Sequence, residues 1–382
     1  MVLHPQSRLL IAGVPASPAP SGTPGNGLRC IAPDDPAGVR LALSQGASLC
    51  VTRATIVEDE APGHIHTLTS GSTGSPKRIR RTYDSWTLSA AVNRDLWQVT
   101  TDDHSVILGG LEQSLALYAL VEGLVLGLTV NVMSGERPDR QCDALQQATM
   151  VYATPTQIRQ VFRRTLPKLR LVIIGGGALD EATKALVKTN APAASVWQFY
   201  GAAETSFISL AGPDAPEGSV GRPYPGVALR PLEQPGPIWV KSPYLSVSYA
   251  AGGSPSTQRD GDWMTVGEIG HMRDGYLYIL GRSDRMFTVA DQNLFPETIE
   301  AALTGIAGVD HVAVLPGPDA QRGNMPVVVY AGSIAPDDLM MAVRRLSLPI
   351  PPRRAVRIDD WPTLPGGKPD LQTLMAMMRS RL

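Results

Sequence analysis

Between about residues 38 and 200, short apolar runs rich in β-branched residues alternate with segments whose apolar residues recur at helical spacing. The runs that predict strands are 48–56, 64–70, 105–110, 128–134, 149–155, 169–177 and 195–201. The segments that predict helices are 38–47, 85–97, 143–148, 154–166 and 179–189. This alternation favours an α/β fold in which a mostly parallel sheet is covered by helices.

The longest apolar run, Leu115–Met133, contains Glu122, two glycines and a β-branched tail. These interruptions predict a core helix followed by a buried strand rather than a membrane span. From Gly218 the pattern changes to strands and turns, and after Arg282 a small α+β segment follows. We therefore expect two domains, residues 1–282 and 283–382.

The composition is that of an ordinary globular protein, with 382 residues, 43% hydrophobic, 18% charged and a net charge of −1. No block of like charge predicts a nucleic-acid or membrane surface. Three cysteines without CxxC spacing indicate free thiols in a reducing compartment. The first residues lack a basic segment followed by a long apolar run, so we expect no signal peptide and a cytoplasmic location.

The segment Thr69–Ser75 consists only of Thr, Ser and Gly, and Lys77 follows it. Glycines let backbone N–H groups approach an anion, hydroxyls donate to it, and the lysine adds a full charge. A strand before the segment and a helix after it would complete an anion cradle. The spacing is not that of a Walker A loop, and a plain Ser/Gly surface turn is the alternative interpretation.

Further motifs follow in order, and together they resemble the adenylate-forming superfamily. This superfamily contains acyl-CoA and aryl-CoA synthetases, adenylation domains of nonribosomal peptide synthetases, and luciferases. The motifs are TSGSTGSPK (69–77), RLVIIGGGALD (170–180), QFYGAAET (198–205), GSVGRPYPGV (218–227), VGEIGHMRDGYLYILGRSDRM (266–286) and PTLPGGKPDL (362–371). The resemblance extends from about Ile65 to the C-terminus.

The resemblance implies a large N-terminal adenylate-forming domain, with parallel sheets and a small β part, and a small mobile C-terminal domain. The hinge would lie at 283–285. The implied activity is that of an AMP-forming acid ligase. ATP and an aryl or short- to medium-chain carboxylic acid give acyl-AMP and pyrophosphate, and a pantetheine thiol of CoA or of an acyl carrier protein then displaces AMP.

Site roles are also implied by the resemblance. Glu204 would hold Mg²⁺, Asp284 would be the hinge, and Lys368 would reach the α-phosphate. The expected ATP-binding residues are Thr69, Ser70, Gly71, Ser72, Thr73, Gly74, Lys77, Gly175, Gly176, Gly177, Tyr200, Gly201, Glu268 and Arg282. Among them, Thr69–Gly74 and Lys77 would hold the β- and γ-phosphates, Tyr200 would pack on the adenine, and Glu268 and Arg282 would contact the ribose.

Simpler interpretations remain for several of these residues. Lys368 could be a solvated turn lysine, Glu204 an acid at a helix N-terminus, and Arg282 and Asp284 a surface pair. The sequence His64-x-His66 places two imidazoles on one strand face, but no third metal ligand is apparent. We expect Arg78, Arg80 and Arg81 to be solvated, with steering of anionic ATP as the alternative.

The sequence departs from the family pattern at several positions. Only about 68 residues precede the phosphate segment, fewer than most members carry, and a homodimer could cover the exposed face. Ala203 replaces the usual Thr, and Glu268 the usual Asp. Gln113, or Glu112 beside it, stands where many members place an aromatic residue or His near the acyl pocket.

The change with the largest expected consequence is at Ala290-Asp291, where members usually have a glycine pair that enters the site for the thiol step. Asp291 adds a Cβ and a negative charge, which disfavour a left-handed backbone and the approach of an anionic cofactor. Adenylation is therefore better supported than CoA transfer. The second class of function is a non-catalytic nucleotide- or acyl-binding partner in a biosynthetic complex.

Overall fold

The computed structural model describes residues 1–16, 27–69, 77–177, 179–319, 321–364 and 369–382. Ser70 to Gly74 and Lys368 therefore lie outside the described residues. The helices are α1 (Pro36–Ser44), α2 (Tyr83–Trp97), α3 (Ser114–Leu126), α4 (Pro138–Leu145), α5 (Pro155–Val161), α6 (Glu181–Asn190), α7 (Pro296–Thr304), α8 (Pro336–Arg345) and α9 (Leu371–Arg379). Among the helices in these ranges, none has both the length and the apolar character needed to cross a bilayer.

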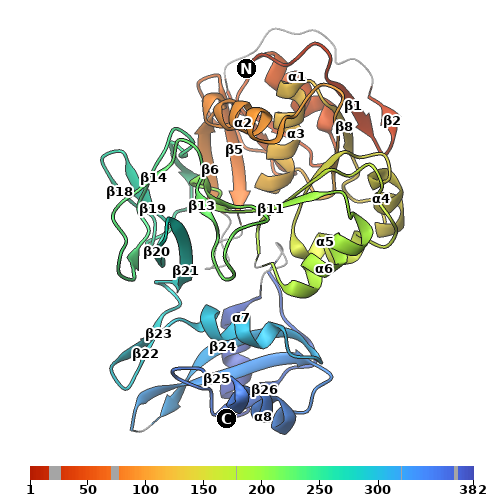
Figure 1. Ribbon diagram of the computed structural model, residues 1–382. Helices are drawn as coiled ribbons and strands as arrows, with labels where there is room; N and C mark the ends of the chain where they lie inside the picture. The colour runs from red at the N-terminus through yellow and green to blue at the C-terminus, as the bar shows by residue number, and fades with distance from the viewer. Residues whose placement is uncertain (17–26, 70–76, 178, 320, 365–368) are drawn as a thin grey trace.

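A nine-stranded sheet has the order β13-β12-β11-β10-β9-β7-β8-β1-β2, and its central strands from β11 to β1 run parallel. Its strands are β1 (Arg8–Ile11), β2 (Val14–Pro15), β7 (His104–Ile107), β8 (Thr129–Val132), β9 (Met150–Ala153), β10 (Leu171–Ile174), β11 (Ser195–Ala202), β12 (Ser206–Ala211) and β13 (Arg222–Pro223). Helices cover this sheet (Figure 1), which confirms the predicted α/β class.

A five-stranded sheet has the order β17-β6-β5-β4-β3. Its strands are β3 (Arg29–Ile31), β4 (Leu49–Val51), β5 (His64–Thr69), β6 (Lys77–Thr82) and β17 (Ser248–Ala251). β5 and β6 are antiparallel partners, with Thr69 opposite Lys77. The helix predicted at 85–97 after the phosphate segment is confirmed as α2, which begins at Tyr83, but strand β6, which was not predicted, separates it from that segment.

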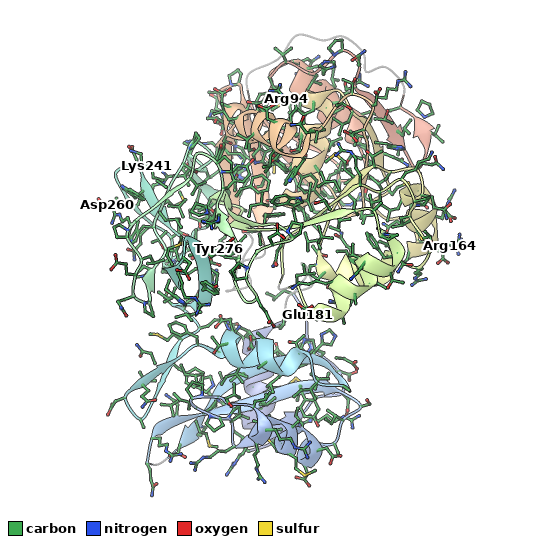
Figure 2. The ribbon with its side chains drawn as sticks, in the orientation of Figure 1. Arg94, Arg164, Glu181, Lys241, Asp260 and Tyr276 are labelled. Carbon is green, nitrogen blue, oxygen red and sulfur yellow. The ribbon has the colours of Figure 1, made fainter. Side chains whose placement is uncertain are left out.

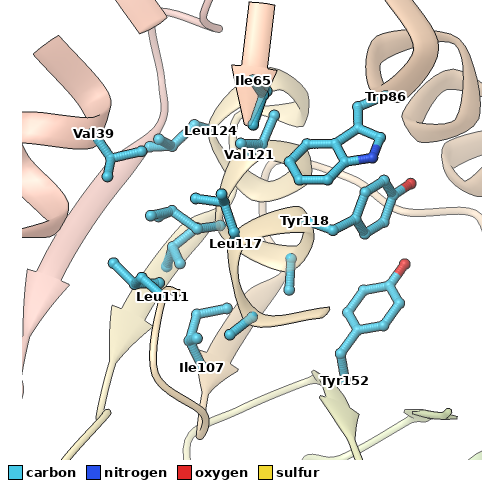
Figure 3. Packing of buried hydrophobic residues seen from close by; sticks show 14 of the residues in the cluster. Val39, Ile65, Trp86, Ile107, Leu111, Leu117, Tyr118, Val121, Leu124 and Tyr152 are labelled. Carbon is cyan, nitrogen blue, oxygen red and sulfur yellow. The ribbon is translucent and has the colours of Figure 1, made fainter. Parts of the chain in front are cut away.

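Helix α3 lies between the two sheets, and almost its whole surface is apolar. Leu117 and Leu120 on α3 are fully buried, and Ile65 of β5 and Ile107 of β7 belong to the same core (Figure 3). A helix enclosed on both sides has no solvent face, which explains why this run lacks the usual polar stripe. The predicted core helix followed by a buried strand is confirmed.

A further part consists of small antiparallel sheets built from the middle of the chain. These strands are β14 (Ala228–Leu229), β15 (Gly236–Pro237), β16 (Val240–Lys241), β18 (Gln258–Asp260), β19 (Trp263–Thr265), β20 (Glu268–Arg273) and β21 (Tyr276–Arg282). In the antiparallel register of β20 and β21, Glu268 pairs with Arg282. The strand-and-turn character predicted from Gly218 is confirmed.

The last hundred residues contain β22 (Phe287–Val289), β23 (Gln292–Leu294), β24 (Val309–Asp319), β25 (Gly323–Gly332), β26 (Arg354–Arg357) and three helices. Apolar side chains pack on both faces of the β24–β25–β26 sheet, with α7 and α8 on one face and α9 on the other. The two buried clusters here share no residue with the clusters formed by residues before Gly281. Figure 1 shows this part, in blue, apart from the rest of the chain.

Candidate active site

One face of the five-stranded sheet presents Thr69, Lys77, Arg81 and Tyr249. The antiparallel register pairs Thr69 with Lys77, Ile65 with Arg81, and Tyr249 with Ile79. Directly paired residues project to the same face of a sheet, and so do residues two apart along a strand. The ends of the phosphate segment therefore project to the same face as the Tyr249 phenol.

Glu204 meets this face from the nine-stranded sheet. It lies in the turn between β11 and β12, so the interpretation as an acid at a helix N-terminus is wrong. Its Oε1 accepts a hydrogen bond of 2.7 Å from the Tyr249 hydroxyl, and its backbone carbonyl accepts one of 2.7 Å from Ser246 N–H. The carboxylate is thus fixed beside the strand that begins with Lys77.

Arg81 lies behind Glu204 and is only 1% exposed. Its guanidinium donates to the hydroxyl of Ser206 at 2.7 Å and to the carbonyl of Ala203. Burial lowers the pKa of Arg81 to about 10, while the charge of Glu204 opposes that shift. Arg81 therefore stays charged at neutral pH as the cationic neighbour of the Glu204 turn.

The expectation that Arg78, Arg80 and Arg81 are solvated is wrong for two of them. Arg78 is 7% exposed and pairs with Glu58, whereas Arg80 is partly exposed and lies 3.4 Å from Glu60. Charged side chains are buried only when they are paired. Their partners Glu58 and Glu60 come from the segment before β5 and lie on the opposite face of the sheet from Arg81.

His64 and His66 also face Glu60. Nδ1 of His64 lies 3.2 Å from one carboxylate oxygen of Glu60, and Nε2 of His66 lies 3.1 Å from the other. Burial lowers the pKa of His66 well below its usual value. In the described ranges no group of three His, Cys, Asp or Glu side chains is placed to hold a metal ion. With its lowered pKa, His66 is neutral at neutral pH beside Glu60.

The residues expected at the nucleoside come together at the edge of β20 and β21. The hydroxyl of Tyr200 donates to a carboxylate oxygen of Glu268, which pairs in register with Arg282. Arg282 donates to both carboxylate oxygens of Asp284 at 3.0 and 3.1 Å. Burial works against the charge of Arg282, yet the hydrogen bonds and charge of Asp284, with Glu268 and Glu204, raise its pKa.

In the glycine turn after β10, the absence of side chains lets other groups come close to the backbone. Gly175 is buried, and a Cβ there would lie 2.1 Å from the Phe199 ring. Gly176 has φ of +76°, a conformation that glycine adopts without cost, and Gly177 is exposed beside it. Gly201 begins the path to Glu204, and a Cβ there would lie 1.9 Å from the Ser206 carbonyl oxygen.

A small cavity adjoins this region at the start of α3. The lining residues are Ile107, Leu108, Gly109, Gln113, Leu115, Ala116, Ala119, Tyr152 and Gln157. The backbone of Gln113 forms a bridge to Leu68, at the end of β5. A larger cavity of about 560 Å³ is lined partly by Lys241 at the outer edge of the molecule (Figure 2) and by none of the predicted site residues.

The hairpin tip at Ala290-Asp291 adopts the backbone that we expected its side chains to disfavour. The φ angles are +46° and +66°, so both residues are left-handed without being glycine. The two-residue connection between β22 and β23 requires φ above zero at both positions. The hairpin geometry therefore prevails over the side-chain preference.

Sequence reasoning missed Arg81 and Tyr249 as site residues. Both reach the Glu204 turn from the other sheet, through side-chain hydrogen bonds between residues that are 125 and 45 positions apart in the chain. The only local signal was the charge of Arg81 two positions after Ile79, in a strand with a buried face. No pattern around Tyr249 marks it.

Comparison with known proteins shows the family to which this chain belongs. Residues 32–250 match the family described as AMP-binding enzyme. An uncharacterized acyl–CoA ligase of Bacillus subtilis is 31% identical over 331 residues, which are 82% of this chain and 68% of that protein. The chain therefore belongs to the AMP-binding enzyme family, within the adenylate-forming superfamily that its motifs resemble.

Two further relatives extend this comparison. A protein named putative long chain fatty acid–CoA ligase, from Staphylococcus epidermidis, is 29% identical over 276 residues, which cover 70% of this chain and 60% of its own length. The structure of o-succinylbenzoate CoA synthetase from Bacillus subtilis with ATP and magnesium has a TM-score of 0.74 at 22% identity. The match covers 84% of this chain and 73% of the synthetase chain. The same enzyme with its acyl-adenylate intermediate gives a TM-score of 0.73 at 23% identity, over 85% of this chain and 72% of its own.

Proposed function

We propose that this protein is an AMP-forming acid ligase that activates a carboxylic acid with ATP and passes the acyl group to a thiol. The observation that carries the proposal is the convergence of Thr69, Lys77 and Glu204 at one sheet face. The relatives named acyl–CoA ligases, and the similar fold that binds ATP and an acyl-adenylate, support it.

The adenylation step needs positioning and charge neutralisation more than a protein nucleophile. A carboxylate oxygen of the substrate attacks the α-phosphorus of ATP, and the bond from that phosphorus to the pyrophosphate oxygen breaks. Thr69 to Gly74 and Lys77 would hold the β- and γ-phosphates. Lys368 would stabilise the charge that grows at the α-phosphate.

The residues present fit a magnesium ion. Mg²⁺ is usually held by one or two carboxylates with substrate phosphates and water, rather than by a cage of protein ligands. Glu204 supplies a carboxylate beside the strand that follows the phosphate segment, and the Tyr249 hydroxyl bonds to its Oε1. Its Oε2 is the oxygen that we propose for the metal. When bound, Mg²⁺ would offset phosphate charge.

For the nucleoside, we propose that Tyr200, the turn Gly175–Gly177 and Gly201 contact the adenine, while Glu268 and Arg282 contact the ribose. Glu268 is one methylene longer than the usual Asp, and its bond to Tyr200 holds that longer side chain in place. The Asp284 carboxylate bound to Arg282 would join the ribose contact to the hinge.

We further propose that residues 1–282 and 283–382 are two domains, with a hinge at 283–285. The separate buried clusters on either side of this boundary support the division. Rotation at Asp284 would withdraw Lys368 after adenylation and bring the Ala290-Asp291 hairpin to the site for the thiol step.

We propose an aryl or a short- to medium-chain acid as the substrate, bound beside the turn Gly175–Gly177, where Gly176 and Gly177 are exposed and carry no side chain. The cavity at the start of α3, of about 10 Å³, is too small to hold an acid as it stands. The acceptor would be the pantetheine thiol of CoA, as the names of the relatives suggest, or of an acyl carrier protein.

Acid-dependent exchange of labelled pyrophosphate into ATP tests the proposal. The panel would contain aryl, short-chain and medium-chain acids. Exchange that requires one class of acid supports adenylation and identifies that class. Binding of ATP without exchange for any acid would instead favour the non-catalytic nucleotide- or acyl-binding role, and a chain that binds no ATP would contradict both functions.

A further inference from the structure

The turn that carries Glu204 has a backbone conformation that is unfavourable in isolation. Ser206 has φ of +56°, and the β11–β12 register shifts between Tyr200 and Gly201. A non-glycine residue in the left-handed region persists only where its surroundings hold it, and such residues gather at functional sites. Contacts from outside the turn must therefore hold Glu204 where it lies.

Arg81 supplies one set of these contacts. Its guanidinium donates to Ala203 on one side of Glu204 and to Ser206, at 2.7 Å, on the other side. It also lies 5.2 Å from the centre of the Trp86 ring, which packs against its face. A planar group with several fixed donors is well suited to hold both ends of a short turn.

Tyr249 supplies the second contact, and it acts on the carboxylate itself. Its hydroxyl donates to Oε1 of Glu204 at 2.7 Å and lies 2.9 Å from Oγ1 of Thr257. A phenol is protonated at neutral pH, so the hydroxyl donates its proton to the carboxylate. With one oxygen of Glu204 fixed, the direction of the other oxygen is set as well.

We propose that Arg81 and Tyr249 are positioning residues for Glu204, Arg81 through the backbone of its turn and Tyr249 through its carboxylate, so that it meets a divalent cation bound with ATP. This inference rests on the proposed function, because it assigns Glu204 to the metal. Both residues belong to the sheet that carries the phosphate segment, so the same strands place the phosphates and the metal ligand.

The test compares the dissociation constant of ATP by calorimetry with Mg²⁺ and with excess EDTA, because the ratio measures what the metal contributes. Tyr249→Phe removes only the hydroxyl and should reduce this contribution by about 10- to 100-fold, the usual effect of losing a hydrogen bond to a metal ligand. The dissociation constant of metal-free ATP should change little. The matched control is Tyr244→Phe, which removes a hydroxyl bonded at 2.7 Å to the Pro225 carbonyl.

The Arg81 contact is tested without removing the buried charge. Ser206→Ala deletes the hydroxyl that accepts the 2.7 Å hydrogen bond from Arg81. This variant should also lower the contribution of the metal to ATP binding, but by less than Tyr249→Phe does. Its control is Ser209→Ala in the same strand, whose hydroxyl donates to the Val220 carbonyl at 2.7 Å.

An unchanged metal contribution in folded Tyr249→Phe and Ser206→Ala, or an equal loss in the two controls, would overturn the inference. Wild-type protein that binds ATP equally well with and without Mg²⁺ would contradict the proposed function instead.

Discussion

The hydroxyl of Tyr200 in β11 donates a hydrogen bond to the carboxylate of Glu268 in β20, so the nine-stranded sheet and the three-stranded sheet meet at the proposed nucleoside site. Tyr200 and Glu268 are 68 positions apart in the chain. Since Glu268 also pairs with Arg282 across the strands, one contact orders the proposed adenine and ribose residues together.

Tyr200→Phe should therefore weaken ATP binding while the fold is kept. Losing one hydrogen bond of this kind costs about 0.5–1.5 kcal/mol, so the KM for ATP in pyrophosphate exchange should rise by roughly 2- to 10-fold. The KM for the acid should stay the same. A larger effect on the acid than on ATP would show that Tyr200 contacts the acyl group instead.

Lys368→Ala should slow adenylation without weakening ATP binding. A charge placed at the transferring phosphate acts mainly in the transition state, and loss of such a group lowers kcat by about 10²–10³. Rapid-quench measurement of acyl-AMP formation, with calorimetry of ATP, separates the two effects. Lys188→Ala, which changes an exposed lysine near the end of α6, serves as the control. Wild-type rates in Lys368→Ala would leave this lysine as a solvated turn residue.

Asp291→Gly should speed the thiol step relative to adenylation when CoA is the acceptor. The glycine adopts the observed φ of +66° without strain, and the loss of the carboxylate removes repulsion of the CoA phosphates. Asp291→Asn separates charge from backbone, because it neutralises the side chain at the same position. The measurement is the rate of acyl transfer from preformed acyl-AMP. A slower transfer in both variants would show that the carboxylate assists the acceptor.

Glu122→Gln should be more stable than the wild-type protein at pH 8, and this advantage should be smaller at pH 5. Burial raises the pKa of Glu122 to about 7, although hydrogen bonds from Asn93 and Tyr118 favour its charged form. The folded state then binds more protons than the unfolded state between about pH 4.5 and 7, so wild-type stability falls as pH rises through that range. The amide keeps an acceptor oxygen and removes the buried charge.

The advantage of Glu122→Gln at pH 8 should be on the order of 2 kcal/mol. Chemical denaturation of both proteins at pH 5 and pH 8 measures it, with the exposed Glu181→Gln as a control. A stability difference that does not change with pH would mean that Glu122 is ionised at both values.

Much of the fold could be predicted because its signals are local. The apolar run 115–133 predicted a core helix followed by a buried strand, and the strand and helix patterns up to residue 200 predicted the parallel sheet. The short strand β6 could not be predicted, since its sequence KRIRRT is mostly cationic and strand pairing with β5 and β17 decides its conformation.

The residues of the site could be predicted from the sequence only where they lie within recognisable motifs. Glu204, Glu268 and Arg282 lie in quoted motifs, whereas Arg81 and Tyr249 gain their role from partners far along the chain. The burial of Arg78 and Arg81 depends on Glu58 and Ala203, which no local pattern places beside them. Long-range pairing of polar groups therefore sets the limit of the prediction.

The central claim is that the acid attacks the α-phosphorus of ATP. The most direct measurement uses the acid found by exchange, labelled with ¹⁸O in both carboxylate oxygens, and follows the label into AMP by mass spectrometry. The AMP should carry one ¹⁸O, because the oxygen that joins the acid to phosphorus stays with AMP when the thiol attacks the carbonyl carbon. AMP without label, or ADP and phosphate as the products, would contradict it.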